Sequence, residues 1–242
     1  IDNYMPLGDW RPSAEHADKN IAAHEKDLDY LAGNIYAGEG YDWYYASAEA
    51  RSQQDRTPSA DGAAGEAWVW RFKDLKSWWE NAHHDRPNGV KDATASAWVP
   101  QSKPLWLTEL GCGAVDLAAN QPNAFSDPKS VEHKSPYFSD GSPDSAMQRQ
   151  FVRAHFEFWR ENGAHYAATN NPISTIYGGS MLDPDRVYLW AWDARPFPAF
   201  PLLRDEWSDG AAYFTGHWLN GRLGGATIDE MAVAIANEAG ID

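Results

Sequence analysis

The residue of this sequence best suited to chemistry is Glu109, which stands near the end of a short apolar run, Leu105–Leu110, between Pro104 and Gly111. An apolar run of this length, bounded by a proline and a glycine, predicts a buried parallel strand. The carboxylate of Glu109 is then expected at the carboxyl end of the sheet, the end at which (β/α) barrels carry their catalytic groups.

A carboxylate in that position is suited to sugar chemistry. An ionised carboxylate can attack an anomeric carbon and stabilise an oxocarbenium-like transition state, with a second carboxyl about 5–5.5 Å away for retention or about 6.5–9.5 Å away for inversion. The alternative is that Glu109 is a structural acid, paired with a neighbouring group at the end of its strand. Residue type and spacing leave both interpretations open.

Polar and aromatic residues near the ends of other strands and in an irregular segment are candidates for contact with a sugar. Aromatic faces stack on the C–H faces of sugar rings, while polar neighbours hydrogen-bond the hydroxyls. Asp2 and Tyr4 end the first strand and could instead hydrogen-bond Glu109, and the aromatic candidates could equally be packing residues. The expected substrate-binding residues are Asp2, Tyr4, Tyr36, Trp43, Trp192 and Asp193.

The composition excludes some classes of partner. The sequence has 35 acidic and 20 basic residues, a formal net charge of -15, so direct binding to nucleic acid or to an anionic membrane surface is disfavoured. No stretch approaches the ~20 apolar residues that span a bilayer. The 13 Trp, 11 Tyr and 9 Phe residues are compatible both with a packed core and with ligand contact.

Neither a metal nor a cofactor is expected. The run His83-His84-Asp85 offers possible ligands, but adjacent side chains at a helix end point to different sides and nothing else supplies ligand spacing. The two histidines are expected to satisfy the C-terminus of a helix instead. Cys112 is expected to be a buried small residue rather than a nucleophile, because no His is paired with it.

Hydrophobic periodicity and turn residues predict an alternation of strands and helices. This order predicts a parallel α/β sheet rather than a β-sandwich. One polar connection exceeds ordinary loop lengths and is therefore either functional or poorly ordered. The predicted elements are a strand in residues 1–7, a helix from Ser13 to Gly33, an irregular excursion over 34–67, a helix over 72–83, a strand over 105–110, the long polar connection over 111–142, a helix from Ser142 to Gly163 and a strand over 187–192.

The C-terminal part differs in character from the rest. Residues 206–226 are expected to be a connector, and residues 227–242, which begin with a capping box, are expected to be the start of a following domain. The first domain is therefore expected to span residues 1–205. Because the sequence begins inside a strand-like run, we expect it to be a piece of a longer protein.

Two sets of motifs resemble known families. Residues 103–111 resemble the seventh-strand motif of the large superfamily of retaining glycosidases, in which the Glu is the nucleophile, while residues 1–7 and 188–192 resemble the sixth and eighth strands. A second, more specific set comprises IDNYMPLGDWR, NIYAGEGYDWYYAS, SWWENAHHDRPNGV, KPLWLTELGCGAVDLAANQPN, NNPIS, LWAWDARPFPAFP and GHWLNGRLG. Over roughly residues 1–225, this set is similar to the TIM-barrel-like domain of the gene transfer agent large tail protein.

The second resemblance implies a fold and a setting. The implied fold is a glycoside-hydrolase-like TIM (β/α)8 barrel, of which this sequence holds the C-terminal portion, about strands six to eight, with a long insertion. The implied setting is a phage-tail-like particle that is assembled in the cytoplasm, released, and acts at the envelope of a recipient cell. The implied partners are polysaccharide or peptidoglycan glycan and other tail proteins of the particle, without direct binding to nucleic acid and without a membrane span.

Two main hypotheses about function follow. In the first, the domain is a retaining glycoside hydrolase that binds or hydrolyses cell-envelope polysaccharide during DNA delivery, with Glu109 as the nucleophile. In the second, it is a catalytically inactive glycan-binding or structural module of the tail tip. A free-standing bacterial hydrolase is a third. The usual acid/base carboxylate after the fourth strand of such barrels does not occur in this sequence, so we expect no measurable hydrolysis by this chain alone.

Overall fold

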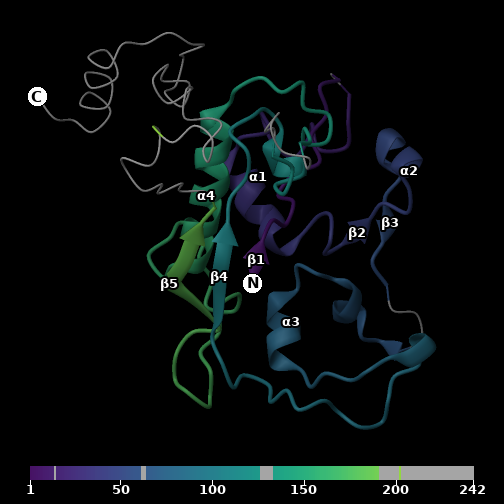
Figure 1. Ribbon diagram of the computed structural model, residues 1–242, viewed down its shortest axis with the longest axis vertical. Coiled ribbons are helices and arrows are strands. Elements are labelled where there is room, and N and C mark those ends of the chain that lie inside the picture. The colour runs from purple at the N-terminus through teal and green to yellow at the C-terminus, as the bar shows by residue number, and fades with distance from the viewer. Residues whose placement is uncertain (14, 61–63, 126–132, 191–201, 203–242) are drawn as a thin grey trace, which may run out of the picture. The chain divides into compact units, whose positions relative to one another are not determined.

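The computed structural model describes residues 1–13, 15–60, 64–125, 133–190 and 202. Residues Ile1–Trp190 form one structural unit, whose centre is a three-stranded parallel sheet (Figure 1). The strands are β1 (Asp2–Asn3), β4 (Leu105–Leu110) and β5 (Leu182–Leu189), in the order β1-β4-β5. The predicted parallel α/β class is thus confirmed, while the described residues form an open sheet and not a closed barrel.

Short elements make up most of the remaining regular structure. A two-stranded antiparallel pair lies within the region 34–67, whose described elements are all short, as the predicted irregular excursion requires. The remaining elements are α1 (Leu28–Gly33), η1 (Asn34–Tyr36), β2 (Trp43–Tyr44), α2 (Ala48–Gln53), β3 (Thr57–Pro58), η3 (Ala67–Trp70), α3 (Leu75–Glu80), η4 (Pro87–Gly89), η5 (Ala118–Asn120) and α4 (Ser145–Trp159).

Two of the described helices, α1 and α4, cover one face of the sheet (Figure 1). Helices α1 and α4 lie side by side against it (Figure 1), and Leu105 and Leu107 of β4 are buried in the same apolar core as Phe151 of α4. Trp106, between the two leucines, is 43% exposed. The prediction of a fully buried strand is therefore wrong for one face of β4, because nothing in the described part of the chain covers the side of the sheet that carries Trp106.

Helix α4 is the element that the sequence predicts best. Its apolar positions recur at helical spacing, and Met147, Phe151, Ala154 and Phe158 are all buried, as an amphipathic helix packed on a sheet requires. The helix begins slightly later than expected, because the carboxylate of Asp144 accepts a hydrogen bond from the backbone N–H of Met147 and caps the first turn.

The first helix is much shorter than predicted. A helix was expected from Ser13 to Gly33, but the structure has helix only over Leu28–Gly33, with Asp27 as its N-cap. The carboxylate of Asp18 is buried, where it accepts a hydrogen bond from Oη of Tyr30 over 2.5 Å. These contacts draw the intervening chain into turns, and Ile21, expected on the apolar stripe, is 65% exposed.

The second predicted helix is also trimmed at both ends. It was expected over 72–83, but α3 spans Leu75–Glu80 because Asp74 accepts a hydrogen bond from Ser77 and caps it. Phe72, expected on its buried stripe, lies before the helix and is 56% exposed. Of the two histidines expected to satisfy the helix C-terminus, His83 does so, since its Nε2 lies 2.7 Å from the carbonyl oxygen of Trp78 in the last turn. The expectation is wrong for His84, whose Nδ1 lies 2.8 Å from the carbonyl oxygen of Asp92, outside the helix.

The last strand begins earlier than predicted, at Leu182 instead of Val187, and ends at Leu189. The predicted end of that strand at Trp192, the expected boundary after residue 205 and the expected elements over 206–226 and 227–242 all lie outside the described residues. Within the described part of the chain, no helix is both long and apolar enough to cross a membrane.

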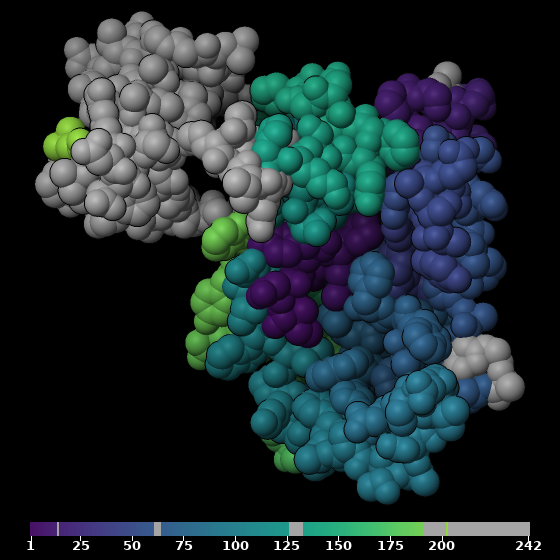
Figure 2. All heavy atoms as spheres, turned by 45° about the vertical axis from the view of Figure 1, so that its right-hand side comes forward, coloured from purple at the N-terminus to yellow at the C-terminus, as the bar shows by residue number. Residues whose placement is uncertain are grey.

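The long connection after β4 packs against the segment that follows β1. The backbone N–H of Leu7 donates to the carbonyl oxygen of Ala119, and Asn120 of η5 is 5% exposed. Figure 2 shows the N-terminal segment in purple beside this connection in teal. Because β1 and β4 are parallel, both segments leave the carboxyl ends of their strands, so together they form the surface at that end of the sheet.

Candidate functional site at the carboxyl ends of the strands

Glu109 lies near the carboxyl end of β4, and its register partner on β1 is Asp2. The two strands run in the same direction, so their carboxyl ends meet at the same edge of the sheet. Asp2 is exposed and Glu109 is half-buried. The sheet therefore brings together two of the residues that the sequence predicts for a sugar site.

A β-bulge interrupts β4 at this point. The strand advances from Leu107 to Leu110 while β5 advances only from Val187 to Leu189, so β4 holds an extra residue. Leu105 and Leu107 are buried two residues apart, but the next buried leucine is Leu110, three residues after Leu107. The alternation of buried and exposed side chains therefore breaks at Glu109. A bulge re-aims side chains locally, and here it turns Glu109 out of the buried row of leucines.

Tyr4 holds the Glu109 carboxylate. Its Oη donates a hydrogen bond to Oε2 of Glu109 over 2.5 Å. Burial raises the pKa of the Tyr4 phenol, and the hydrogen bond to Glu109 raises it further, so Tyr4 keeps its proton and remains the donor. The ring of Phe125 packs edge-on against Tyr4, with the centroids 5.7 Å apart. Among the described residues, none donates a hydrogen bond to Oε1 of Glu109, which leaves that oxygen available to a ligand.

The uncovered face of the sheet continues this site. Oγ1 of Thr108 donates to Oδ1 of Asp2 over 2.7 Å, and the guanidinium of Arg186 lies 5.2 Å from the centroid of the Trp106 ring. Tyr188 is 47% exposed. Trp106, Arg186 and Tyr188 were not among the residues predicted to contact a sugar. The alternation of Leu105, Trp106 and Leu107 is a signal that could have identified Trp106.

Tyr36 lies at the opposite end of the strands. Its ring packs edge-on against Trp159, with the centroids 5.6 Å apart, and Nδ2 of Asn171 donates to the carbonyl oxygens of Trp159 and Leu182. Leu182 is the first residue of β5. The structure therefore does not bring Tyr36 together with Glu109, and its surroundings are those of a packing residue.

Trp43 belongs to a polar network beside the segment that follows β1. The guanidinium of Arg56 lies 4.1 Å from the Trp43 ring centroid, and its Nη2 bridges Asp9, at 2.7 Å, and Asp18, at 2.5 Å. Tyr45 also donates to Asp9. Since Asp9 and Asp18 are buried, these pairs fix the β2–β3 region to the segment after β1, and none of them includes Glu109.

The remaining predictions concern Trp192, Asp193, Cys112 and a possible metal site. Trp192 and Asp193 lie outside the described residues. Cys112 is buried, as expected, and burial raises the pKa of its thiol. No group of three or more His, Cys, Asp or Glu side chains in the described part of the chain is arranged to hold a metal ion.

A parallel sheet with helices packed on one face and polar side chains at the carboxyl ends of adjacent strands defines an α/β protein. The comparison with protein families agrees with this class and narrows it. The model of the GTA TIM-barrel-like domain matches residues 1–201. The chain belongs to this family. No curated protein matches it.

Proposed function

We propose that this domain of a gene transfer agent particle binds polysaccharide or peptidoglycan glycan at the carboxyl ends of its strands, with Glu109 as the central contact. The observation that supports the proposal is the hydrogen bond from Tyr4 to Oε2 of Glu109, which orients the carboxylate, while no described residue donates to Oε1. A half-buried carboxylate held in this way accepts hydrogen bonds from sugar hydroxyls without a cost of reorganisation.

Neighbouring groups suit the same ligand. Asp2 supplies a second acceptor beside Glu109, already oriented by Thr108. The exposed rings of Trp106 and Tyr188 on the same sheet offer flat faces for the C–H sides of sugar rings. Carboxylates next to exposed aromatic rings form a surface for a neutral, hydroxyl-rich chain better than for an anionic one.

In the catalytic form of this proposal, Glu109 is the nucleophile of a retaining glycosidase. Its ionised carboxylate attacks the anomeric carbon, and Tyr4 keeps it in position through the bond to Oε2. A second carboxyl must protonate the leaving oxygen. Turnover therefore requires such a carboxyl in addition to Glu109, whereas binding requires only the contacts described above.

Glycan co-sedimentation tests the proposal. The chain is mixed with insoluble peptidoglycan and with extracellular polysaccharide, and the bound fraction is compared for wild type, Glu109→Gln and the control Glu161→Gln. Glu161 is exposed, so its substitution makes the same change of charge away from the sheet end. We expect Glu109→Gln to weaken binding about tenfold and the control to retain it. No binding to any glycan, or equal binding by both variants, would contradict the proposal.

A further inference from the structure

A second concave site lies beside the sheet end and does not include Glu109. It is a pocket of about 530 Å³, within the usual size of small-molecule sites. Its walls come from the segments that leave β1 and β4, which places it on the carboxyl-end side of the sheet, where α/β proteins bind ligands. The residues of its lining that could contact a ligand include Trp10, Arg11, His16, Glu25, Leu117 and Phe138.

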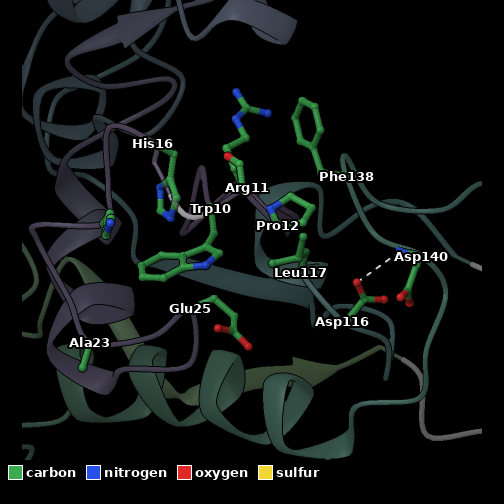
Figure 3. Close-up of a pocket in the computed structure, with 12 residues that line it drawn as sticks. Trp10, Arg11, Pro12, His16, Ala23, Glu25, Asp116, Leu117, Phe138 and Asp140 are labelled. Carbon is green, nitrogen blue, oxygen red and sulfur yellow. Dashed lines mark hydrogen bonds between the residues drawn. The ribbon is translucent and has the colours of Figure 1, made fainter.

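The indole of Trp10 occupies the middle of this pocket. Figure 3 shows it between His16 on one side and Leu117 on the other, with Glu25 below it. The rings of Trp10 and His16 meet edge-on, with the centroids 4.5 Å apart. Burial lowers the pKa of His16, so this ring is neutral near pH 7. An aromatic ring flanked by carboxylates and an uncharged imidazole is suited to a sugar ring.

One buried side chain, Asn120, fixes both walls of the pocket. Its Oδ1 accepts from the backbone N–H of Trp10 at 3.0 Å, and its Nδ2 donates to the carbonyl oxygens of Trp10, at 2.9 Å, and Tyr137, at 3.1 Å. Tyr137 precedes Phe138 of the opposite wall. The pocket is therefore built by hydrogen bonds inside the core and is not an accidental gap between loops.

The backbone of this lining is strained. Leu117 has φ 53° and Phe138 has φ 67°, a left-handed conformation that is rare for bulky residues. Such strain persists only where surrounding contacts hold it, and it gathers at ligand clamps. Asp116 supplies part of that hold, since it accepts hydrogen bonds from Ser139 and from the backbone N–H of Gly141.

Three buried polar atoms of the lining lack partners. Nε and Nη1 of Arg11 and Nδ1 of His16 have no hydrogen-bond partner among the described residues. Arg11 is 6% exposed, and the ring of Phe138 covers its guanidinium at 3.7 Å. Unpaired buried polar groups are costly, so these atoms would gain hydrogen bonds from the oxygen atoms of a ligand in the pocket.

The charges of the pocket favour a neutral ligand. Arg11 is already paired with Asp9 at 2.9 Å, and Lys19 is paired with Glu15 at 2.5 Å. Neither Asp9 nor Glu15 belongs to the lining, which carries three carboxylates of its own. Glu25 is paired with Lys26 at 2.9 Å, which leaves Asp116 and Asp140 to oppose an anionic ligand, whereas the hydroxyls of a neutral ligand can donate to all three carboxylates.

We propose that this pocket is a second glycan site, which takes a neutral saccharide of one or two rings against Trp10 and holds its oxygen atoms with Arg11, His16 and Glu25. This proposal and the proposed function both name a glycan as the ligand, but they depend on different residues. The pocket would hold one part of a glycan chain while Glu109 contacts another, or would act without Glu109.

Titration of the chain with soluble disaccharides tests this inference. Cellobiose and N,N′-diacetylchitobiose are the neutral probes and digalacturonate is the anionic one, with binding followed by calorimetry up to about 10 mM. We expect at least one neutral probe to bind, and Trp10→Ala to weaken it about tenfold. The control Trp70→Ala, at a ring that is 56% exposed and outside the pocket, is expected to bind as the wild type does.

The outcomes separate the two proposals. Absence of binding by both neutral probes, equal or tighter binding of digalacturonate, or retention of binding in Trp10→Ala would each overturn the pocket proposal. Binding that is lost in Glu109→Gln but kept in Trp10→Ala would overturn it while supporting the proposed function. Trp10→Phe keeps an aromatic face, so partial recovery of affinity relative to Trp10→Ala distinguishes stacking from a loss of folding, which circular dichroism checks independently.

Discussion

The two ends of the parallel strands use polar side chains in opposite ways. At the amino ends, Asn171 is 2% exposed and Lys73 is 1% exposed. The side chains of both residues donate hydrogen bonds to backbone carbonyl oxygens of the same region. At the carboxyl ends, Glu109 has one oxygen bound by Tyr4, and the other has no donor in the part of the chain that the structure describes. Polar groups that are fully satisfied and buried stabilise the fold, whereas half-satisfied groups at a sheet edge are available to a ligand.

The largest expected effect comes from removing the side chain of Asn171 at the amino ends of the strands. Its Nδ2 donates to the carbonyls of Trp159 and Leu182, and its Oδ1 accepts from the N–H of Leu182 at 2.8 Å. Asn171→Ala removes the partner of the Trp159 carbonyl and of the Leu182 N–H, while the Leu182 carbonyl keeps a hydrogen bond from Ser180, so we expect the free energy of unfolding to fall by about 3 kcal/mol. Urea denaturation measures this, with the exposed Asn162→Ala as control. A loss below about 1 kcal/mol would show that the structural role is assigned wrongly.

The buried His155 allows a second test of this comparison, through the dependence of the free energy of unfolding on pH. Its burial, with the nearby charge of Lys73, lowers the pKa to about 3 in the folded state. The unfolded chain binds a proton near pH 6.5, so the stability contribution is complete above that pH and is lost as the pH falls from 6.5 towards 3. Between pH 7 and pH 4 this group alone is expected to cost about 3 kcal/mol.

The measurement for His155 is a set of urea denaturation curves from pH 7 to pH 4. Carboxylates also titrate in this interval, so the informative quantity is the difference between wild type and His155→Gln. The variant should lose less stability on acidification than the wild type does. If both proteins lose the same amount of stability on acidification, His155 is not a neutral, buried group in the folded state.

The smallest effect on stability, and a clear one on binding, is expected at the carboxyl end. Tyr4→Phe removes the hydrogen bond to Oε2 of Glu109 at a partly exposed position, so the free energy of unfolding should change by less than about 1 kcal/mol. The affinity for glycan should fall about fivefold because the carboxylate loses its orientation. Co-sedimentation measures the affinity, with Tyr166→Phe as control. An unchanged affinity in Tyr4→Phe would show that Tyr4 does not contribute to glycan binding.

Local patterns in the sequence predicted what depends on local interactions. The apolar run over 105–110 is a strand, and the stripe through Met147 and Phe151 is the buried face of a helix. The helix expected from Ser13 failed because Asp18 contacts Arg56, a partner far along the chain that periodicity cannot reveal. The bulge before Leu110 likewise depends on pairing with β5.

The candidate site was predictable only in part. Glu109 and Tyr4 could be named from their places at the ends of apolar runs, and the structure joins them. Tyr36 has the same residue type and similar neighbours in sequence, but its ring packs at the other end of the strands. The Trp10 pocket escaped prediction because its walls come from two segments about a hundred residues apart, joined through Asn120.

The most direct test of the central claim is to observe which rings a glycan touches. In NMR spectra of the chain with selectively labelled aromatic residues, soluble peptidoglycan glycan strands are added stepwise. The account predicts that the signals of Tyr4 and Tyr188, near the carboxyl ends, shift with added glycan while those of Tyr36 and Trp159 stay in place. Shifts confined to Tyr36 and Trp159, or no shift at Tyr4, would contradict it.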